Sequence, residues 1–162
     1  MYATREDLRA AAGEIITCGI AGIDVTSETR EILREVQPGG LILFARNIDN
    51  PAQCAALTRE LKLLRKDSPL SLSVDQEGGR VARVRAPATE WPPMRTLGDI
   101  GDPDLVQRVG LALARELRAM NFDIDYAPVL DVDSNPDNPI IGDRSFSRVP
   151  AQVSLLGTAL VQ

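Results

Sequence analysis

The sequence predicts an α/β protein whose helices alternate with the strands of a parallel sheet. Short apolar runs such as LILF at 41–44 contain no alternating polar residues, which is typical of parallel strands buried on both faces. The stretches between these runs carry apolar residues at helical spacing, and several begin with a helix-capping residue. Alternation of this kind indicates parallel strands joined by right-handed crossovers.

The first part of the chain contains two predicted helices and one short apolar run. Thr4 followed by Asp7 indicates the start of a helix, because both side chains can bond to backbone groups of the first turn. The run IITCGIAG at 15–22 is either a buried strand or the last turn of this helix. Ser27 is predicted to cap a second helix that continues through Val36.

Two predicted strands, 41–44 and 70–75, flank the third helix. This helix is expected to begin at Asn50–Pro51, with asparagine as the cap and proline in the first helical position. The apolar stripe of the helix is predicted to comprise Cys54, Leu57, Leu61 and Leu64.

The remaining sequence predicts one more strand and two more helices. The segment 85–101 is rich in proline and glycine and is predicted to be a long loop, after which Asp102–Pro103 opens a helix. A strand is predicted in FDIDYAPVLDV at 122–132, followed by an irregular segment at 133–148 and a helix without a C-cap by Gln162. These elements make about four βα units, whereas a closed barrel has eight. The sequence therefore predicts either an incomplete (β/α)8 barrel or an open, doubly wound sheet of four strands.

Composition excludes several classes of function. The net charge of −5 and pI near 4.8 argue against a nucleic-acid or anionic-membrane partner. No apolar run is long enough to span a bilayer and no secretory signal is visible, so a cytoplasmic protein is expected. Cys18 and Cys54 are expected to be unpaired, with a disulfide as the alternative. The absence of histidine excludes Ser-His-Asp and Cys-His catalysis and histidine-ligated zinc within this chain.

Polar residues stand where three predicted strands end. They are Arg46 and Asn47, then Asp75, Gln76 and Glu77, then Asp131 and Asp133. Ligands of α/β proteins bind at the carboxyl ends of parallel strands, so we expect these side chains to gather at one rim of the sheet.

The sequence after the 70–75 strand predicts a sharp reversal of the chain. Gly78–Gly79 can turn without the steric restriction of a Cβ atom and can bring Arg80 and Arg83 back toward the rim. An aspartate can accept bonds from two neighbouring sugar hydroxyls, and an arginine offers several donors in a fixed fork. One alternative is an ordinary turn with solvated acids and an exposed Asp143–Arg144 ion pair. Another is Mg²⁺ bound by the carboxylates.

Four motifs together resemble the N-terminal domain of glycoside hydrolase family 3. They are GGLILFARNI, VDQEGGRVARV, YAPVLDV and IGDRSFS, in this order and spacing, and the resemblance extends from about Leu8 to the end of the chain. It is closest to the single-domain bacterial β-N-acetylhexosaminidases of that family. The resemblance implies that residues 1–162 form the N-terminal half of a TIM-like (β/α)8 catalytic barrel. It also implies hydrolysis of β-linked N-acetylglucosamine from the non-reducing end of glycosides, in bacteria during recycling of cell-wall muropeptides, without a metal or organic cofactor.

The resemblance also implies which residues contact the sugar. Asp75, Arg83 and Arg144 match residues that bind the terminal sugar in the family, and Asp131 is expected at the rim of the pocket. After the IGDRSFS region such enzymes carry a Lys-His pair, an Asp-His acid/base dyad on a loop and an aspartate nucleophile. No catalytic residue is therefore expected before Gln162, and the chain alone is predicted to be inactive. Its unpaired sheet edges predict self-association.

Three alternatives remain open from the sequence. A β-glucosidase of the same family would differ in what recognises the 2-position of the sugar. A non-catalytic sugar-binding half-barrel would form oligomers and bind sugar without turnover. A Mg²⁺ enzyme that uses the acidic rim would lose activity in the presence of a chelator.

Overall fold

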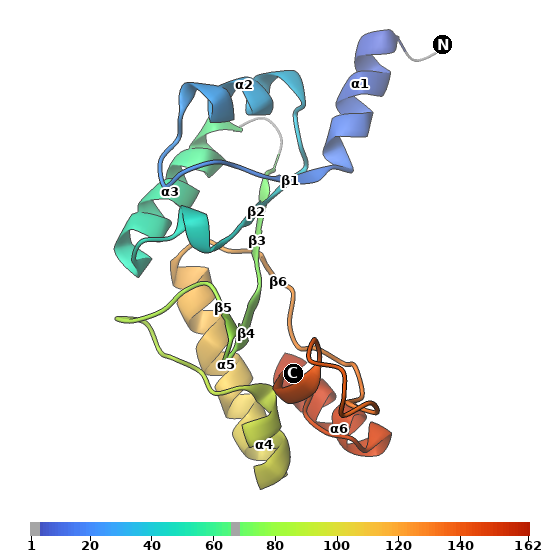
Figure 1. Cartoon of the computed structure of the whole chain (residues 1–162). Coiled ribbons are helices and arrows are strands. Elements are labelled where there is room, and N and C mark those ends of the chain that lie inside the picture. The colour runs from blue at the N-terminus through green and yellow to red at the C-terminus, as the bar shows by residue number, and fades with distance from the viewer. Residues whose placement is uncertain (1–3, 66–68) are drawn as a thin grey trace. The chain divides into compact units, whose positions relative to one another are not determined.

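The computed structural model describes residues 4–65 and 69–162, and the chain divides into two compact units (Figure 1). The first unit is built from Met1–Val74 and Arg118–Asp125. The second unit is built from Asp75–Leu117 and Tyr126–Gln162.

The first unit contains a four-stranded, fully parallel sheet in the order β1-β2-β3-β6. Its strands are β1 (Thr17–Gly19), β2 (Gly40–Leu43), β3 (Ser71–Val74) and β6 (Ile124–Asp125). The strand order follows the chain without a reversal, whereas a doubly wound sheet reverses its order at a switch point. The predicted α/β class with parallel strands is confirmed, and the arrangement is that of four βα units of a TIM-like barrel.

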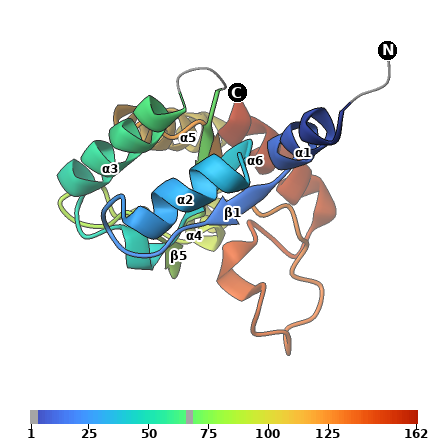
Figure 2. The same cartoon turned by 90° about the horizontal axis from the view of Figure 1, so that it is seen from above.

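Three helices accompany this sheet. They are α1 (Arg5–Glu14), α2 (Ser27–Glu35) and α3 (Pro51–Leu64). Thr4 and Asn50 cap α1 and α3 as predicted. The predicted cap of α2 is wrong by one residue: the side chain of Thr26 accepts from the backbone N–H of Thr29 at 3.1 Å, and Ser27 is the first helical residue. Helices α2 and α3 lie side by side in both views (Figures 1 and 2).

The core of the first unit forms where the strands and α3 meet. Leu41, Leu72 and Cys54 are fully buried. Leu64, predicted to belong to the apolar stripe of α3, is 38% exposed in the last turn of the helix, so that prediction is wrong. Cys18 and Cys54 are both free, as expected, and burial raises the pKa of the Cys54 thiol to about 11.

The second unit contains a short antiparallel hairpin and three helices. The elements are β4 (Gln76–Gly78), β5 (Val81–Ala82), α4 (Met94–Ile100), α5 (Pro103–Ala119, of which the last two residues belong to the first unit) and α6 (Pro150–Val161). Helix α4 corrects the prediction of a continuous loop at 85–101. It begins directly after Pro93 and ends at Gly101, which has the left-handed conformation (φ +69°) typical of a C-terminal cap.

The strand predicted at 122–132 is also corrected. Only β6, Ile124–Asp125, pairs with the sheet, and the chain from Tyr126 onward belongs to the second unit. Pro128 has no backbone N–H to donate to a neighbouring strand, which disfavours an extension of the ladder.

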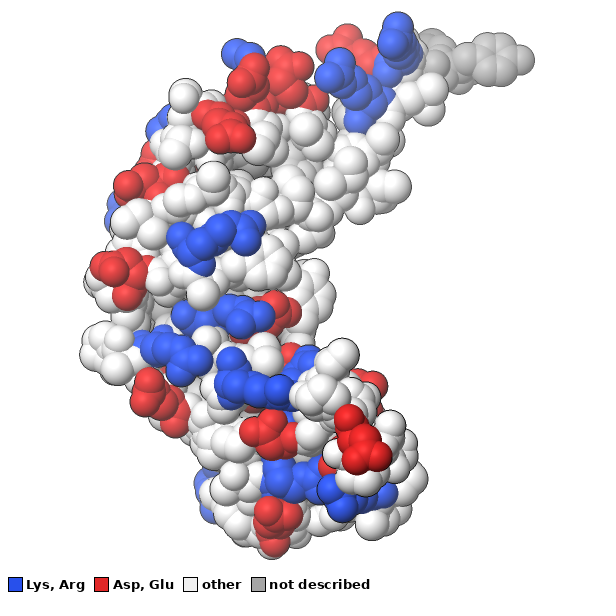
Figure 3. All heavy atoms as spheres, in the orientation of Figure 1, with Lys and Arg blue, Asp and Glu red and all other residues white. Residues whose placement is uncertain are grey.

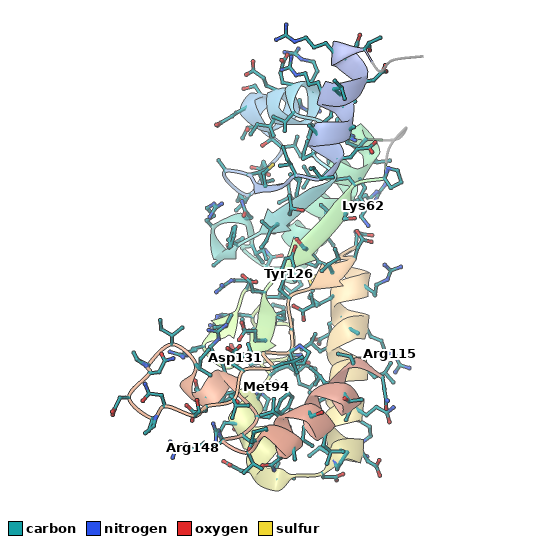
Figure 4. The ribbon with its side chains drawn as sticks, turned by 90° about the vertical axis from the view of Figure 1, so that its right-hand side faces the viewer. Lys62, Met94, Arg115, Tyr126, Asp131 and Arg148 are labelled. Carbon is teal, nitrogen blue, oxygen red and sulfur yellow. The ribbon has the colours of Figure 1, made fainter. Side chains whose placement is uncertain are left out.

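The core of the second unit joins its helices to the irregular segment before α6. Its buried members are Met94, Leu97, Val106, Phe146, Val153, Leu156 and Ala159 (Met94 is labelled in Figure 4). A Cβ atom on Gly98 would lie 1.7 Å from the carbonyl oxygen of Phe146. Helix α4 therefore packs directly on the backbone of the segment that follows Arg144, and only glycine fits at this contact.

Candidate functional site

The reversal predicted at Gly78–Gly79 is present and forms the hairpin of β4 and β5. Both glycines have positive φ (+96° and +55°), and a Cβ atom on Gly78 would lie 2.4 Å from the carbonyl oxygen of Pro92. The side-chain oxygen of Gln76 accepts from the backbone N–H groups of Arg83 and Val84 at 2.8 and 2.9 Å. The turn and the Gln76 side chain together return the chain so that Arg83 lies beside Asp75.

Asp75 and Arg83 form a half-buried ion pair. A terminal nitrogen of Arg83, Nη2, donates to Oδ2 of Asp75 at 3.2 Å, and the two side chains are 26% (Arg83) and 23% (Asp75) exposed. The Nε atom of Arg83 is buried and has no hydrogen-bond partner in the described residues. The pair is reachable from solvent and leaves lone pairs and N–H groups of both residues for a ligand.

Arg144 is held in the same unit by Glu77. Arg144 lies at the end of a short 3-10 turn (η2, Gly142–Arg144), and its Nε and Nη2 atoms donate to Oε2 and Oε1 of Glu77, both at 2.8 Å. The hydrogen bonds to Glu77 raise the pKa of Arg144. Burial opposes this increase, and the charges of Glu77, Asp131 and Asp75 add to it. The structure therefore brings Asp75, Arg83, Arg144 and Asp131 into one acid–arginine cluster together with Glu77.

Asp131 differs from the other members in its exposure. The residue is exposed, and Figure 4 shows it labelled on the segment that follows β6. Its backbone carbonyl accepts from the hydroxyl of Ser145 at 2.6 Å. This bond ties the segment that carries Asp131 to the residue directly after Arg144.

Asp133, the other acid predicted at this strand end, is a buried anchor of the loop. Its Oδ2 accepts from Arg95 at 2.9 Å and from Arg148 at 3.2 Å, and its backbone N–H donates to the carbonyl of Ser147. These contacts close the base of the loop between residues 133 and 147. The carboxylate of Asp133 is therefore a structural partner of Arg95 and Arg148 and is not a member of the cluster.

Arg46 and Asn47 belong to the first unit, where their side chains donate to backbone carbonyls. Asn47 is fully buried, and its amide donates to the carbonyls of Ile20 and Gly22 at 3.0 and 2.7 Å. The guanidinium of Arg46 lies 4.7 Å from the centre of the Phe44 ring, and its Nε donates to the carbonyl of Ile20. Both side chains hold the turns at the ends of β1 and β2.

The sequence interpretation missed the roles of Glu77 and Arg80. In a strand, residues two apart point to the same side, so the spacing of Asp75 and Glu77 could have indicated a shared face. Arg80 donates from Nη2 to the carbonyls of Ile140 and Ile141 at 2.6 and 3.1 Å, a backbone contact that no sequence pattern signals.

Further features of the described residues that bear on function are grooves, candidate metal-binding groups, candidate membrane-spanning helices and surface charge. A groove of about 1000 Å³ in the first unit is lined by α1 and the end of α2, and it shares no residue with the cluster. Within residues 4–65 and 69–162, no group of three or more acidic, cysteine or histidine side chains could hold a metal ion. None of the described helices has the length and apolar content needed to cross a membrane. On the face shown in Figure 3, acidic and basic side chains are interspersed.

The fold and the cluster define an α/β domain that presents carboxylates and guanidinium groups beside one another after its strands. Comparison with known proteins identifies the family. Residues 8–162 match the family model described as the glycosyl hydrolase family 3 N terminal domain. The chain therefore belongs to glycosyl hydrolase family 3, and the predicted resemblance is confirmed.

Three bacterial proteins illustrate this similarity. The chain is 47% identical to a beta-hexosaminidase of Nitrosomonas eutropha over 148 residues, which cover 88% of this chain and 42% of the relative. It superposes with a TM-score of 0.90 and 36% identity on a family 3 beta-N-acetylglucosaminidase from Paenibacillus sp., covering 95% and 30% of the two chains. NagZ from Neisseria gonorrhoeae, solved in complex with N-trifluoroacetyl-D-glucosamine, matches with a TM-score of 0.83 and 40% identity over 90% of this chain and 44% of NagZ. The chain thus spans less than half the length of these relatives.

Proposed function

We propose that this chain is the N-terminal, sugar-binding part of a β-N-acetylhexosaminidase. The complete enzyme would remove β-linked N-acetylglucosamine from the non-reducing end of a glycoside. The observation that carries this proposal is the acid–arginine cluster, in which Asp75 and Arg83 are paired at 3.2 Å and Arg144 is held by Glu77. The beta-hexosaminidase of Nitrosomonas eutropha and the NagZ complex with an N-acylated glucosamine support this choice of substrate.

The chemistry of the cluster suits a neutral, hydroxylated ligand. The carboxylate of Asp75 can accept from two adjacent hydroxyl groups, while Arg83 and Arg144 can donate to hydroxyl oxygens on the other side of the ring. Each guanidinium is already paired with a carboxylate, so the ligand needs no negative charge of its own. Asp131, which is exposed, would contact the sugar at the edge of the pocket.

The proposal assigns the bond-breaking residues to sequence beyond Gln162. Retaining glycosidases use a nucleophilic carboxylate and an acid/base group on either side of the glycosidic bond. We do not assign these roles to Asp75, which is already paired with Arg83 at 3.2 Å, or to Asp131, which is proposed to contact the sugar at the edge of the pocket. Reading the gene past codon 162 tests this directly: a lysine-histidine pair and a histidine-bearing loop are expected, and their absence would contradict the assignment.

The substrate is tested with the full-length gene product. Release of 4-nitrophenol from the β-N-acetylglucosaminide is expected to be much faster than from the β-glucoside, and the reverse order would identify the β-glucosidase alternative. Asp75→Ala is expected to raise KM or abolish turnover, because it removes the acceptor for two hydroxyls. Asp99→Ala, which removes an exposed carboxylate of α4 in the same unit, is the matched control and should leave the rates unchanged.

The 162-residue chain alone is expected to be inactive on both substrates and to self-associate. A groove of about 320 Å³ between Pro128, Leu130 and α6 is mainly apolar, and Leu130 and Val161 beside it are 60% and 67% exposed. Sedimentation velocity would detect association, and a strictly monomeric chain would contradict it. A stable dimer that binds N-acetylglucosamine, from a gene that encodes no catalytic residues, would favour the non-catalytic half-barrel.

The cellular role is a further part of the proposal. We infer that the enzyme acts in the cytoplasm on muropeptide-derived sugars during cell-wall recycling. Cell fractionation and the accumulation of N-acetylglucosaminyl muropeptide fragments after deletion of the gene test this role. A normal muropeptide pool in the deletion strain would contradict it.

A further inference from the structure

Glu77 is a buried carboxylate whose described hydrogen bonds go to a single partner. Its side chain is 5% exposed, and a carboxylate this buried is costly unless its charge is paired and its oxygens accept hydrogen bonds. Both oxygens accept from Arg144 at 2.8 Å, one from Nε and the other from Nη2. This is the side-on, two-bond geometry in which a carboxylate fixes the orientation of a guanidinium plane.

The pairing determines which donors of Arg144 remain. Of the five N–H groups of the guanidinium, two bond to Glu77 and one, on Nη1, bonds to the carbonyl of Ile140 at 3.2 Å. One N–H on each terminal nitrogen then has no partner among the residues described. The Arg144 side chain is 23% exposed, so these donors can reach a ligand while the opposite edge of the plane is held.

The turn between β4 and β5, which follows Glu77, also holds the backbone of the loop that carries Arg144. Arg80, three residues after Glu77, donates to the carbonyls of Ile140 and Ile141 and lies 3.3 Å from the carboxylate of Asp143. Glu77 and Arg80 stand on either side of Gly78–Gly79, whose positive φ angles permit both to reach the one loop. Glu77 therefore orients the side chain of Arg144, and Arg80 holds the backbone that precedes it.

We propose that Glu77 is a positioning residue that orients the guanidinium of Arg144 for sugar hydroxyls and does not itself contact the sugar. The identity of the ligand in this statement rests on the proposed function. The orientation of Arg144 by Glu77 does not, because it can be observed without any sugar.

The first test is spectroscopic and uses the full-length gene product. In the wild type the Nε–H of Arg144, protected by Glu77, should give a resolved NMR signal that exchanges slowly with water. Glu77→Gln should broaden or remove this signal, because an amide cannot accept both N–H groups. A signal that remains as slowly exchanging in Glu77→Gln as in the wild type would overturn the proposal.

The second test is a double-mutant cycle in the full-length enzyme. Glu77→Gln is expected to lower kcat/KM on the β-N-acetylglucosaminide by about tenfold, mainly through KM. In the Arg144→Met background the same change should alter kcat/KM by less than about twofold, because its effect acts through Arg144. Additive effects would overturn the proposal. Arg144→Met alone leaves the buried Glu77 carboxylate without its partner, whereas the double variant removes both charges together, so the folding of all three variants is checked by circular dichroism.

Asp123→Asn is the control for the loss of a paired carboxylate outside the loop that carries Arg144. Asp123 belongs to the first unit and pairs with Lys62 and Arg118. This variant should lower the unfolding temperature while the Arg144 Nε–H signal stays protected, and loss of that signal would show that general destabilisation explains the Glu77 result. If the wild-type enzyme does not cleave N-acetylglucosaminides, the proposed function fails, but the NMR comparison still decides the role of Glu77.

Discussion

Buried carboxylates paired with arginines distinguish the second unit from the first among the described residues. In the first unit, Asn47, Thr58 and Ser73 are buried and donate to backbone carbonyls. In the second unit, the buried carboxylates of Glu77 and Asp133 accept from arginine side chains. Buried side chains such as Gln76 and Ser145 also bond to the backbone in the second unit. Among the described residues, buried carboxylates that hold arginine side chains are the feature particular to the second unit.

This difference indicates how the two units divide their roles. A buried backbone carbonyl that loses its donor pays the cost of an unmade hydrogen bond. The bonds from buried side chains to backbone carbonyls in the first unit are therefore needed for folding. A half-exposed pair such as Asp75 and Arg83 can exchange part of its hydration for the hydroxyls of a ligand without unfolding. Substitutions in the first unit should therefore reduce stability, and substitutions in the cluster should mainly reduce binding.

Asn47→Ala should have the largest effect on the free energy of unfolding. A small effect would contradict the difference in roles drawn between the two units. The change removes two donors to the carbonyls of Ile20 and Gly22 and an acceptor for the N–H of Phe44 at 3.0 Å. We expect the free energy of unfolding to fall by about 2 kcal/mol, because the N–H of Phe44 loses its acceptor and the carbonyl of buried Ile20 keeps only the Arg46 donor. Urea unfolding followed by circular dichroism measures it. The exposed Asn135→Ala is the control, and an equal loss there would contradict the argument.

Arg83→Met tests the second unit and should separate binding from stability. Loss of the pair with Asp75 should weaken binding of N-acetylglucosamine about tenfold to a hundredfold, while unfolding changes by only about 1 kcal/mol. Calorimetric titration and urea unfolding of the same sample give both quantities. Arg85→Met, at an exposed arginine two residues later, should leave both unchanged. A larger change in unfolding than in binding would reverse the roles assigned to the units.

Asp123→Asn should have a smaller effect that depends on pH. Burial disfavours the charged form of Asp123, but hydrogen bonds from Lys62 and the N–H of Leu72 and the charges of Lys62 and Arg118 outweigh it, so its pKa is lowered from 3.8. A lowered pKa in the folded state stabilises the protein above about pH 4, and this stabilisation is lost as the pH falls through the folded value. We expect Asp123→Asn to cost about 1 kcal/mol at pH 7 and almost nothing near pH 2. A pH-independent difference would contradict the electrostatic explanation.

Arg30→Met should have the smallest effect, although it removes a short ion pair between two helices of the first unit. Arg30 on α2 and Glu60 on α3 are 2.6 Å apart, but both side chains are about half exposed. Water screens such a pair, so the free energy of unfolding should change by less than about 0.5 kcal/mol. Urea unfolding at low and high salt checks this. A loss above that of Asp123→Asn would show that distance matters more than burial in this protein.

The sequence predicted the site best where neighbours in the chain also become neighbours in space. Asp75 and Arg83 are eight residues apart across two glycines, so turn chemistry alone was enough to expect their contact. Glu77 was harder to interpret, because its partner Arg144 lies 67 residues away and only tertiary structure joins them. Arg46 and Asn47 also stand at the end of a predicted strand, yet their side chains donate to the backbone carbonyl of Ile20, which follows β1.

The fold was predicted well where capping residues mark the ends of elements. Asn50–Pro51 and Asp102–Pro103 stand at the starts of α3 and α5 as expected. Helix α4 was not predicted, because the many prolines and glycines of segment 85–101 indicate a loop. Pro93 directly precedes the helix and Gly101 ends it, and at these two places proline and glycine favour a helix boundary. The 122–132 run was expected as one strand because periodicity cannot show where a chain leaves a sheet.

The pairing of each cluster arginine with a carboxylate has a consequence for which solutes compete with the sugar. Arg83 and Arg144 retain donors for a ligand, yet Asp75 and Glu77 cancel their charge within the same cluster. Phosphate, sulfate and uronic acids should therefore be poor inhibitors, and affinity for an uncharged saccharide should hardly change between dilute and concentrated salt.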